Sequence, residues 1–216
     1  MKAVLISIQP KWCELIASGK KTVEVRKTKP KLETPFKVYI YETKALYKPN
    51  GCNHLFEGKG KVIGEFVCDS IANYEAELWD DETYERIQEF YEPDDFAEYG
   101  EYEYKPVADN GDDFWKENML CKASCLTVEE LRKYVGKGFA EFYGWTISDL
   151  VIYDKPKELS EFFVYCDRCD KRPIACKFAY EESNENGYYS ECMCDFKRPI
   201  ERPPQSWFYV ERLGEG

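Results

Sequence analysis

Three charged side chains follow one another at short spacing near the start of the chain. Lys21, Glu24 and Arg26 lie in the stretch GKKTVEVRK, residues 19–27, most of which has the composition of a β-strand. Side chains alternate between the two faces of a strand, so Glu24 and Arg26 share the face opposite the two valines. The long side chain of Lys21 can turn toward them from the corner where the strand begins. Cations of this kind bind phosphate or carbonyl oxygens, and a carboxylate accepts hydrogen bonds from an exocyclic amino group.

Two other interpretations of these residues stay open. Glu24 and Arg26 on an exposed strand would form a surface ion pair, worth well under about 1 kcal/mol and without chemical function. In an enzyme, Lys21 would serve as a base or electrostatic anchor and Glu24 would activate water. A cleft around the three groups would favour function, whereas an exposed or flatly packed strand would favour the ion pair.

Five cysteines between residues 166 and 194 form a second cluster with chemical potential. Cys166 and Cys169 make a C-x2-C pair, and Cys192 and Cys194 make a C-x-C pair. Two such pairs about twenty residues apart can complete a tetrahedral zinc site. We predict that these four thiolates bind one structural Zn²⁺, with Cys176 as the alternative to Cys192 or Cys194. The other interpretation is a set of free thiols in a loose C-terminal loop.

Single residues elsewhere carry less information. His54 is the only histidine and lies in a glycine-rich loop, where we expect it to be exposed. A lone histidine argues against a Ser/His or Cys/His catalytic site. Cys13 is expected to pack in the core. Trp145 and Tyr143 are also expected in the core, and stacking on a base is their alternative role.

The charge of the chain is divided between its parts. The net charge of -11 argues against binding of nucleic acid over the whole surface, since phosphate contacts come from Lys and Arg. Residues 1–61 nevertheless carry 13 Lys and Arg against 5 Asp and Glu, whereas residues 62–130 carry 4 against 21. The basic charge is therefore concentrated around Lys21 and Arg26.

The elements that position these residues follow from apolar patterns and helix caps. Pro10 suits the first position of a helix that Gly19 ends, and Thr127 with Glu130 predicts a capping box for the helix 128–135. The acidic stretch 74–91 is predicted to be helical. Strand patterns occur at residues 3–8, 22–27, 36–43, 61–71, 142–154 and 206–211.

Together these elements predict one α+β domain over residues 1–216. We expect a mostly antiparallel β-barrel with flanking helices, in which the first and last strands share a sheet. An acidic insertion spans about residues 73–125, and a cysteine-rich zinc knuckle spans about residues 164–204. The first apolar run is too short for a signal peptide and no later run could span a membrane, so we expect a cytoplasmic protein with no membrane partner.

The run SIQPKWCELIASGKKTVEVRK, residues 7–27, resembles the start of ASCH domains, with a G-x-K-x-x-E-x-R motif at Gly19, Lys21, Glu24 and Arg26. Later strands are also similar, so the resemblance covers most of the chain outside residues 73–125. It implies a PUA-like β-barrel that binds RNA or handles nucleosides. One branch of the family hydrolyses the acetyl group of N4-acetylcytidine. In that branch the lysine matched by Lys21 activates a threonine, whose position is Glu24 here.

The sequence therefore predicts RNA or modified-nucleoside binding through a cleft around Lys20, Lys21, Glu24 and Arg26. One alternative is an amidohydrolase acting on an N-acylated nucleobase such as N4-acetylcytidine, with Lys21 and Glu24 as its catalytic residues. Another is a protein-interaction module that uses the acidic insertion. The oligomeric state is left open.

Overall fold

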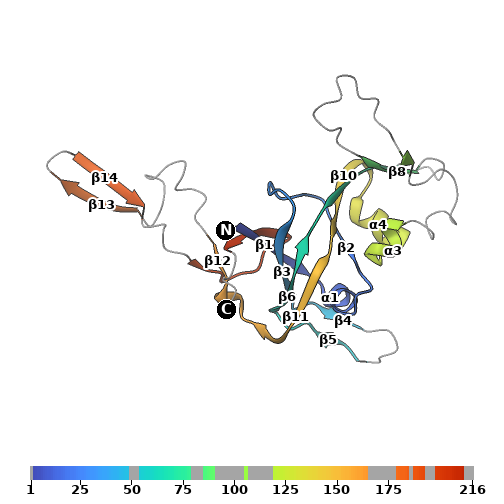
Figure 1. The fold of residues 1–216 in the computed structure, drawn as a ribbon, viewed down its shortest axis with the longest axis horizontal. Coiled ribbons are helices and arrows are strands. Elements are labelled where there is room, and N and C mark those ends of the chain that lie inside the picture. Colours follow the sequence, from blue (N-terminus) through green and yellow to red (C-terminus); the bar gives the residue numbers. More distant parts are fainter. Residues whose placement is uncertain are drawn as a thin grey trace, which may run out of the picture.

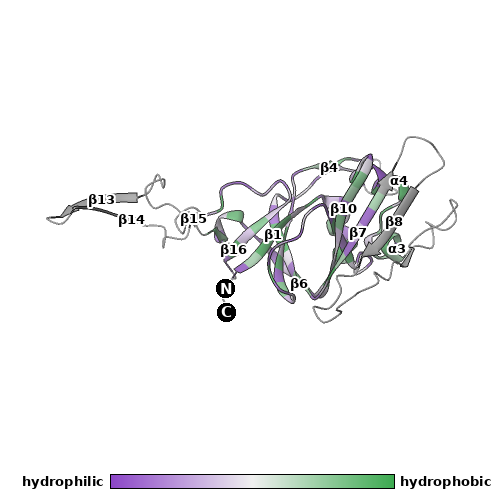
Figure 2. Cartoon of the chain, turned by 90° about the horizontal axis from the view of Figure 1, so that it is seen from above, coloured by the Kyte–Doolittle hydropathy of each residue, from purple (hydrophilic) through white to green (hydrophobic). Residues whose placement is uncertain are grey.

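The computed structural model describes part of the chain, namely residues 2–48, 54–78, 85–90, 105–106, 119–164, 179–184, 187–192 and 198–211. Two five-stranded sheets form two layers, with a short helix, α1 (Pro10–Ala17), at their edge (Figure 1). Two further helices, α3 (Met119–Ser124) and α4 (Val128–Val135), lie on the far side of the second sheet (Figure 2). The fold is mostly β with few helices, in agreement with the predicted α+β class.

The first sheet contains both the first and the last described strands. In spatial order its strands are β11 (Ser148–Lys157), β6 (Lys61–Cys68), β3 (Phe36–Glu42), β1 (Lys2–Ile8) and β16 (Trp207–Glu211). β1 pairs antiparallel with β16, so the prediction that the two ends of the chain share a sheet is confirmed. β1 and β3 run parallel because α1 and the strand β2 (Val23–Arg26) connect them as a crossover, whereas the other pairs are antiparallel.

The second sheet contains the strand with Glu24 and Arg26. In spatial order it contains β2 (Val23–Arg26), β10 (Gly138–Thr146), β7 (Ile71–Leu78), β8 (Glu85–Phe90) and β9 (Lys105–Pro106), all paired antiparallel. Three two-stranded ribbons complete the described strands, formed by β4 (Leu46–Tyr47) with β5 (Phe56–Glu57), β12 (Phe163–Val164) with β15 (Arg198–Pro199), and β13 (Ala179–Asn184) with β14 (Gly187–Cys192). A 3-10 turn, η1 (Leu159–Glu161), precedes β12.

Three sequence-based expectations differ from the structure. We expected a β-barrel, but the pairings of the described strands give two five-stranded sheets and three two-stranded ribbons, and no closed barrel. The predicted strand 142–154 is two strands, β10 and β11, which belong to different sheets because the chain turns at Ile147. The predicted helix 74–91 is wrong, because the described parts of this stretch, residues 74–78 and 85–90, belong to the strands β7 and β8. Tyr74 and Ala76 are buried and Glu75 between them is half-buried, which is the period of a strand paired with β10.

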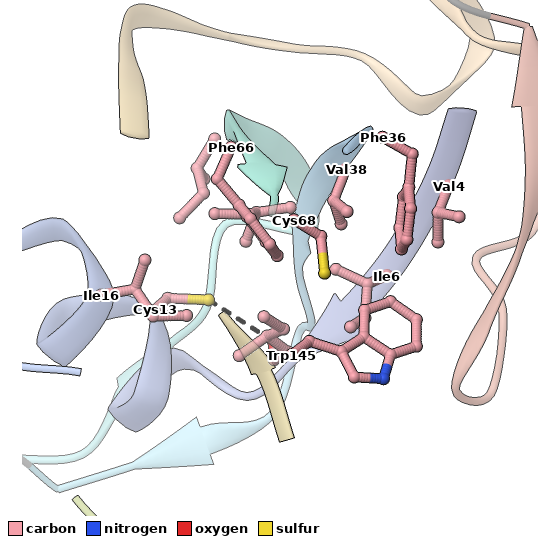
Figure 3. Packing of buried hydrophobic residues seen from close by; sticks show 12 residues of the cluster. Val4, Ile6, Cys13, Ile16, Phe36, Val38, Phe66, Cys68 and Trp145 are labelled. Atoms are coloured by element: carbon pink, nitrogen blue, oxygen red, sulfur yellow. Dashed lines mark hydrogen bonds between the residues drawn. The ribbon is translucent and has the colours of Figure 1, made fainter. Parts of the chain in front are cut away.

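The core between the two sheets centres on Trp145 of β10 (Figure 3). This side chain is fully buried and meets Phe36 of the first sheet edge to face, with ring centroids 5.9 Å apart. Cys13 of α1 is buried in the same cluster, where its thiol donates to the Ile8 carbonyl. The core positions predicted for Trp145 and Cys13 are therefore confirmed. Tyr143 packs against this cluster while partly buried.

The outer face of the first sheet contains a polar network around Glu65. The Glu65 carboxylate accepts from Lys37 Nζ at 2.6 Å and from the Tyr153 hydroxyl at 2.5 Å, which links β3, β6 and β11. Burial alone would raise the pKa of Glu65, but the hydrogen bonds from Lys37 and Tyr153 outweigh it and lower this pKa below its usual value.

This lowered pKa makes a prediction about stability and pH. A carboxyl whose folded pKa is depressed stabilises the protein above its unfolded pKa of about 4.3, and this contribution is lost as pH falls through the folded value. Glu65→Gln should therefore lower the free energy of unfolding at pH 7, and the difference from wild type should shrink below about pH 5. Urea unfolding at several pH values measures this difference. Glu33→Gln, on an exposed residue, is the control, and a pH-independent difference for Glu65→Gln would contradict the prediction.

The zinc prediction lies outside the described residues. Cys166, Cys169, Cys176 and Cys194 are not described, and of Cys192 only the backbone is described, at the end of β14. Among the side chains that are described, no group of three or more His, Cys, Asp and Glu could hold a metal ion. In the same part of the chain, no helix has the length and apolar character needed to cross a membrane.

Candidate functional site

The turn after α1 places Lys21 at the corner where β2 begins. Gly19 takes a positive φ of 71°, and the backbone amides of Lys20 and Lys21 both donate to the Leu15 carbonyl. This hydrogen bonding closes the helix and turns the chain into β2. Lys21 therefore leaves the helix close to the charged residues of the strand, although it falls on the parity of the valines.

β2 directs Glu24 and Arg26 toward the first sheet. Val25 packs on the opposite face, in the cluster covered by α3 and α4. Glu24 lies opposite Trp145 in the register with β10, so it shares the side of the sheet that Trp145 buries. The alternation predicted for this strand is thus observed, and the charged face points inward rather than to open solvent.

The three charged residues form one buried cluster, which we call the triad. Lys21 Nζ lies 3.3 Å from Glu24 Oε2, and Arg26 Nη2 lies 2.9 Å from Glu24 Oε1. The exposed fractions of Lys21, Glu24 and Arg26 are only 3%, 7% and 9%. The interpretation as an exposed surface ion pair is therefore wrong. One carboxylate between two cations leaves a formal charge of +1 in a site largely removed from water.

Backbone carbonyls complete the triad from two other elements. Lys21 Nζ donates to the Ser124 carbonyl at the end of α3 at 2.7 Å. Arg26 Nη2 donates to the Ser7 carbonyl of β1, also at 2.7 Å, and so connects the two sheets. Charge-assisted hydrogen bonds of this kind are shorter and stronger than neutral ones. Each cation of the triad therefore has both a carboxylate and a backbone partner.

Some hydrogen-bonding capacity in the triad is unused. Arg26 Nε is buried without a hydrogen-bond partner, and so is the Ser124 hydroxyl. An ammonium has three N–H donors, and two of those on Lys21 are directed to Glu24 and Ser124. Its nitrogen also lies 5.3 Å from the centre of the Trp12 ring. A ligand above the triad would thus meet an ammonium donor, a guanidinium and carboxylate lone pairs.

A pocket of about 1140 Å³ opens above the triad. Its volume exceeds the roughly 300–1,000 Å³ typical of small-molecule sites, so a nucleotide would fit with room to spare. Trp12 of α1 and Tyr134 of α4 supply aromatic surface in its lining. The lining also includes Ser7, Thr43, Lys44, Ala45, Glu130 and Lys133. Lys20 is exposed and does not line the pocket, so the structure does not bring it together with the triad.

The sequence did not indicate that residues of α4 line the pocket. The capping box of Thr127 and Glu130 is present as predicted, but a local cap does not reveal which helix lies next to α4. In the structure Lys11 Nζ lies 2.5 Å from Glu130 Oε1, which joins α1 to α4. Burial raises the pKa of the Tyr134 hydroxyl, with Arg26 opposing this shift and Glu24 adding to it, so this ring lies within reach of the triad charges.

The remaining single residues stay outside the pocket lining. His54 is exposed, as predicted. The pKa of the Cys13 thiol is raised far above its usual value by burial and by the negative charges of Glu42 and Glu24, so this cysteine is unsuited to act as a nucleophile. Trp145 lies opposite Glu24 in the pairing of β2 with β10 and does not line the pocket.

Comparison with known proteins identifies the family. The model of the ASCH domain matches residues 6–122. A crystal structure of ASCH from Zymomonas mobilis is similar over 97% of this chain and 88% of that chain, at 16% sequence identity and a TM-score of 0.49. A mutant of that protein has a TM-score of 0.47 at 16% identity, over 98% and 92% of the two chains. Among curated proteins none matches. Since the family model matches more than half of its residues, the chain belongs to the ASCH domain family.

Proposed function

We propose that this chain binds RNA or a modified nucleoside through the pocket above Lys21, Glu24 and Arg26. One observation carries the proposal, namely that two cations and a carboxylate lie buried together beneath a pocket of about 1140 Å³. Apolar residues often stabilise a protein as well as buried ions do, so an ion cluster at a pocket is better explained by a ligand than by stability. The association of the ASCH domain family with RNA binding supports the same function.

The chemistry of the triad suits the edge of a nucleobase. Lys21 and Arg26 donate to a carbonyl or phosphate oxygen, and Glu24 accepts from an exocyclic amino group. Trp12 and Tyr134 offer aromatic surface on which a base can stack, which is how single-stranded RNA is commonly held. A base that carries an amino group next to a carbonyl, as cytosine does, fits this pattern of donors and acceptor best.

Two conservative substitutions test the proposal. Arg26→Lys keeps the charge but loses the planar group that reaches Glu24 and Ser7 together, so affinity should fall about tenfold. Glu24→Gln removes the charge and turns half of the carboxylate into a donor, so affinity for bases with an amino group should fall by a similar factor. Calorimetric titration with the four nucleosides, their 5′-monophosphates and N4-acetylcytidine measures both effects. Lys155→Ala, on an exposed lysine of β11, is the control. Unchanged affinities in both variants would contradict the proposal.

An amidohydrolase is the second candidate function, and the proximity of Lys21 to Glu24 supports it. Lys21 would polarise the acyl oxygen while Glu24 takes a proton from water. The water oxygen then bonds to the acyl carbon, the C–N bond breaks, and the amine leaves with a proton, giving acetate and cytidine from N4-acetylcytidine. Both oxygens of Glu24 already lie against cations, which favours the binding role. Chromatography of N4-acetylcytidine incubated with the protein distinguishes an amidohydrolase from a binding protein, because only the enzyme releases cytidine. If the protein is the enzyme, Glu24→Gln should abolish this release while binding persists.

The interaction module that would use the acidic insertion stays a prediction. Most of residues 79–118 are outside the described part of the chain, where β8 and β9 are described by their backbone alone. A pull-down would test it with a variant in which the Asp and Glu residues of 91–104, between β8 and β9, are replaced by their amides, because β7 and α3 within the insertion support the second sheet and the triad.

For the C-terminal cysteines we propose one structural Zn²⁺ bound by Cys166, Cys169, Cys192 and Cys194. Protein purified without chelator should contain about one equivalent of zinc by mass spectrometry, and Cys166→Ser should lose it. Cys125→Ser, on a half-buried cysteine beside α3, is the matched control. If Cys176→Ser loses zinc and Cys192→Ser or Cys194→Ser does not, Cys176 is the ligand in place of that residue. Zinc well below one equivalent would contradict the site.

A further inference from the structure

The ribbon of β4 and β5 presents apolar side chains to solvent beside the pocket. The exposed fractions of Leu46, Leu55 and Phe56 are 66%, 65% and 45%. The ribbon is anchored to α1, because the Tyr47 hydroxyl donates to Glu14 at 2.5 Å, and the Tyr47 and Phe56 rings lie 6.2 Å apart. In the register of the ribbon Phe56 lies opposite Tyr47, so these two rings share the face that is anchored to α1, whereas Leu46 lies on the other face. The exposed Phe56 ring beside Tyr47 is therefore a candidate contact surface.

This ribbon is continuous with the pocket lining. Thr43, Lys44 and Ala45 line the pocket, and β4 begins at the next residue, Leu46. Figure 1 shows β4 and β5 directly beside α1, the helix that supplies Trp12 to the pocket. A ligand that fills the pocket and extends past Lys44 therefore comes to the ribbon that carries Phe56.

Positive charge accompanies the apolar surface. Lys44 and Lys48 are exposed, and neither has an ion-pair partner among the described residues. The stem of Lys44 lies across Gly60, where an added Cβ would approach Lys44 Cε to 2.4 Å. Gly60 has a positive φ of 64°, so the chain here favours glycine and leaves room for Lys44 at the pocket rim. A lysine held in this place is suited to bind a phosphate between a base in the pocket and the next nucleotide.

We propose that the ligand is a single-stranded nucleic acid, whose chain runs from the pocket over Lys44 onto the ribbon of β4 and β5. One base occupies the pocket, the adjoining phosphate contacts Lys44, and the neighbouring base packs on Phe56, on the face of the ribbon that also carries Tyr47. This proposal rests on the proposed function of the pocket. Basic groups interleaved with exposed aromatic and aliphatic side chains match the alternating phosphates and bases of a single strand. An apolar protein partner would leave the unpaired lysines without a role.

Affinity as a function of ligand length tests the path. Each nucleoside 5′-monophosphate and the matching RNA homohexanucleotide are titrated by calorimetry and fluorescence anisotropy at several salt concentrations. Stacking of one base on an aromatic side chain contributes about a five- to hundredfold change in affinity. Phe56→Ala should therefore weaken hexanucleotide binding by about this factor and leave monophosphate binding unchanged. Lys44→Ala should weaken hexanucleotide binding and reduce the slope of log affinity against log salt by about 0.7.

Two control substitutions show whether any loss of affinity is specific to the proposed path or follows from removing any exposed aromatic residue or lysine. Phe139→Ala removes an aromatic side chain that is 58% exposed on β10, and Lys155→Ala removes an exposed lysine on β11, and neither residue lines the pocket. Both controls should bind the hexanucleotide like wild type. Because Phe56 is exposed, retained monophosphate binding also shows that Phe56→Ala is folded.

The outcomes distinguish this inference from the proposed function. A monophosphate that binds as tightly as its hexanucleotide overturns the path and leaves the pocket function standing. A hexanucleotide advantage that persists in Phe56→Ala and Lys44→Ala, or that the controls lose equally, also overturns the path. No binding of any monophosphate or hexanucleotide overturns the pocket function and the path together. A hexanucleotide advantage lost only in Phe56→Ala and Lys44→Ala supports the path.

Discussion

Glu24→Ala is expected to lower the free energy of unfolding by about 3–5 kcal/mol, because it leaves two buried cations without their carboxylate. Lys21 and Arg26 would retain only the backbone carbonyls of Ser124 and Ser7, and their charges would repel each other across the emptied space. Urea denaturation followed by circular dichroism measures the loss. The effect is large because the three side chains are at least nine-tenths buried.

A second carboxylate and a second substitution serve as controls. Glu33→Ala, on an exposed residue without an ion pair in the described part of the chain, should change stability by less than about 0.5 kcal/mol. Lys21→Met combined with Glu24→Ala should cost less than the sum of the single changes, since removing both partners leaves fewer unpaired charges. A loss below about 1 kcal/mol for Glu24→Ala would mean that water screens the triad.

Trp145→Ala is the other change with a large expected effect, about 3–5 kcal/mol in the free energy of unfolding. The indole fills the space between the sheets, where its ring lies 5.9 Å from both Phe36 and Trp207. Since Trp145 lies opposite Glu24 in the strand register, the cavity would also loosen the pocket floor. We therefore expect weaker ligand binding in addition to lower stability, which denaturation and calorimetry measure separately.

Trp145→Phe is the informative control for this change. Its ring keeps most of the contacts, and the lost indole N–H has no hydrogen-bond partner, so no buried bond is broken. The cost should be smaller than that of the alanine variant. Phe139→Ala, on an exposed ring, should be close to neutral. Equal losses in Trp145→Ala and Phe139→Ala would show that Trp145 does not organise the core.

Local sequence signals predicted the elements around the site well. Pro10 begins α1, Gly19 follows its end with a positive φ, and the capping box at Thr127 begins α4. These signals depend on a few neighbouring residues, so the sequence contains them. The prediction of a helix at residues 74–91 was wrong. The composition of this stretch permits a helix, but β7 pairs with β10, some seventy residues away, and this pairing makes it a strand.

The sequence was enough to predict which charged residues form the site, but not what surrounds them or how deeply they are buried. Strand alternation was enough to place Glu24 and Arg26 on one face. The carbonyl that binds Lys21 belongs to Ser124, 103 residues further along the chain, and no local pattern indicates that contact. Burial of the triad, the aromatic lining and the separation of Lys20 from the pocket depend in the same way on how α1, α3 and the two sheets pack.

The ion pair between Lys11 and Glu130 makes the shape of the pocket sensitive to electrolyte. It joins α1 to α4, the two helices that carry Trp12 and Tyr134, and its side chains are 52% and 35% exposed. Salt at about 1 M shortens the screening length to about 3 Å, which weakens such a pair while it barely affects the buried triad. For the proposed nucleic-acid ligand we therefore expect ionic strength to act on binding twice, through the phosphates of the ligand and through the spacing of the pocket walls. In Lys11→Met, which lacks this ion pair, the slope of log affinity against log salt concentration should reflect only the contacts with the phosphates of the ligand.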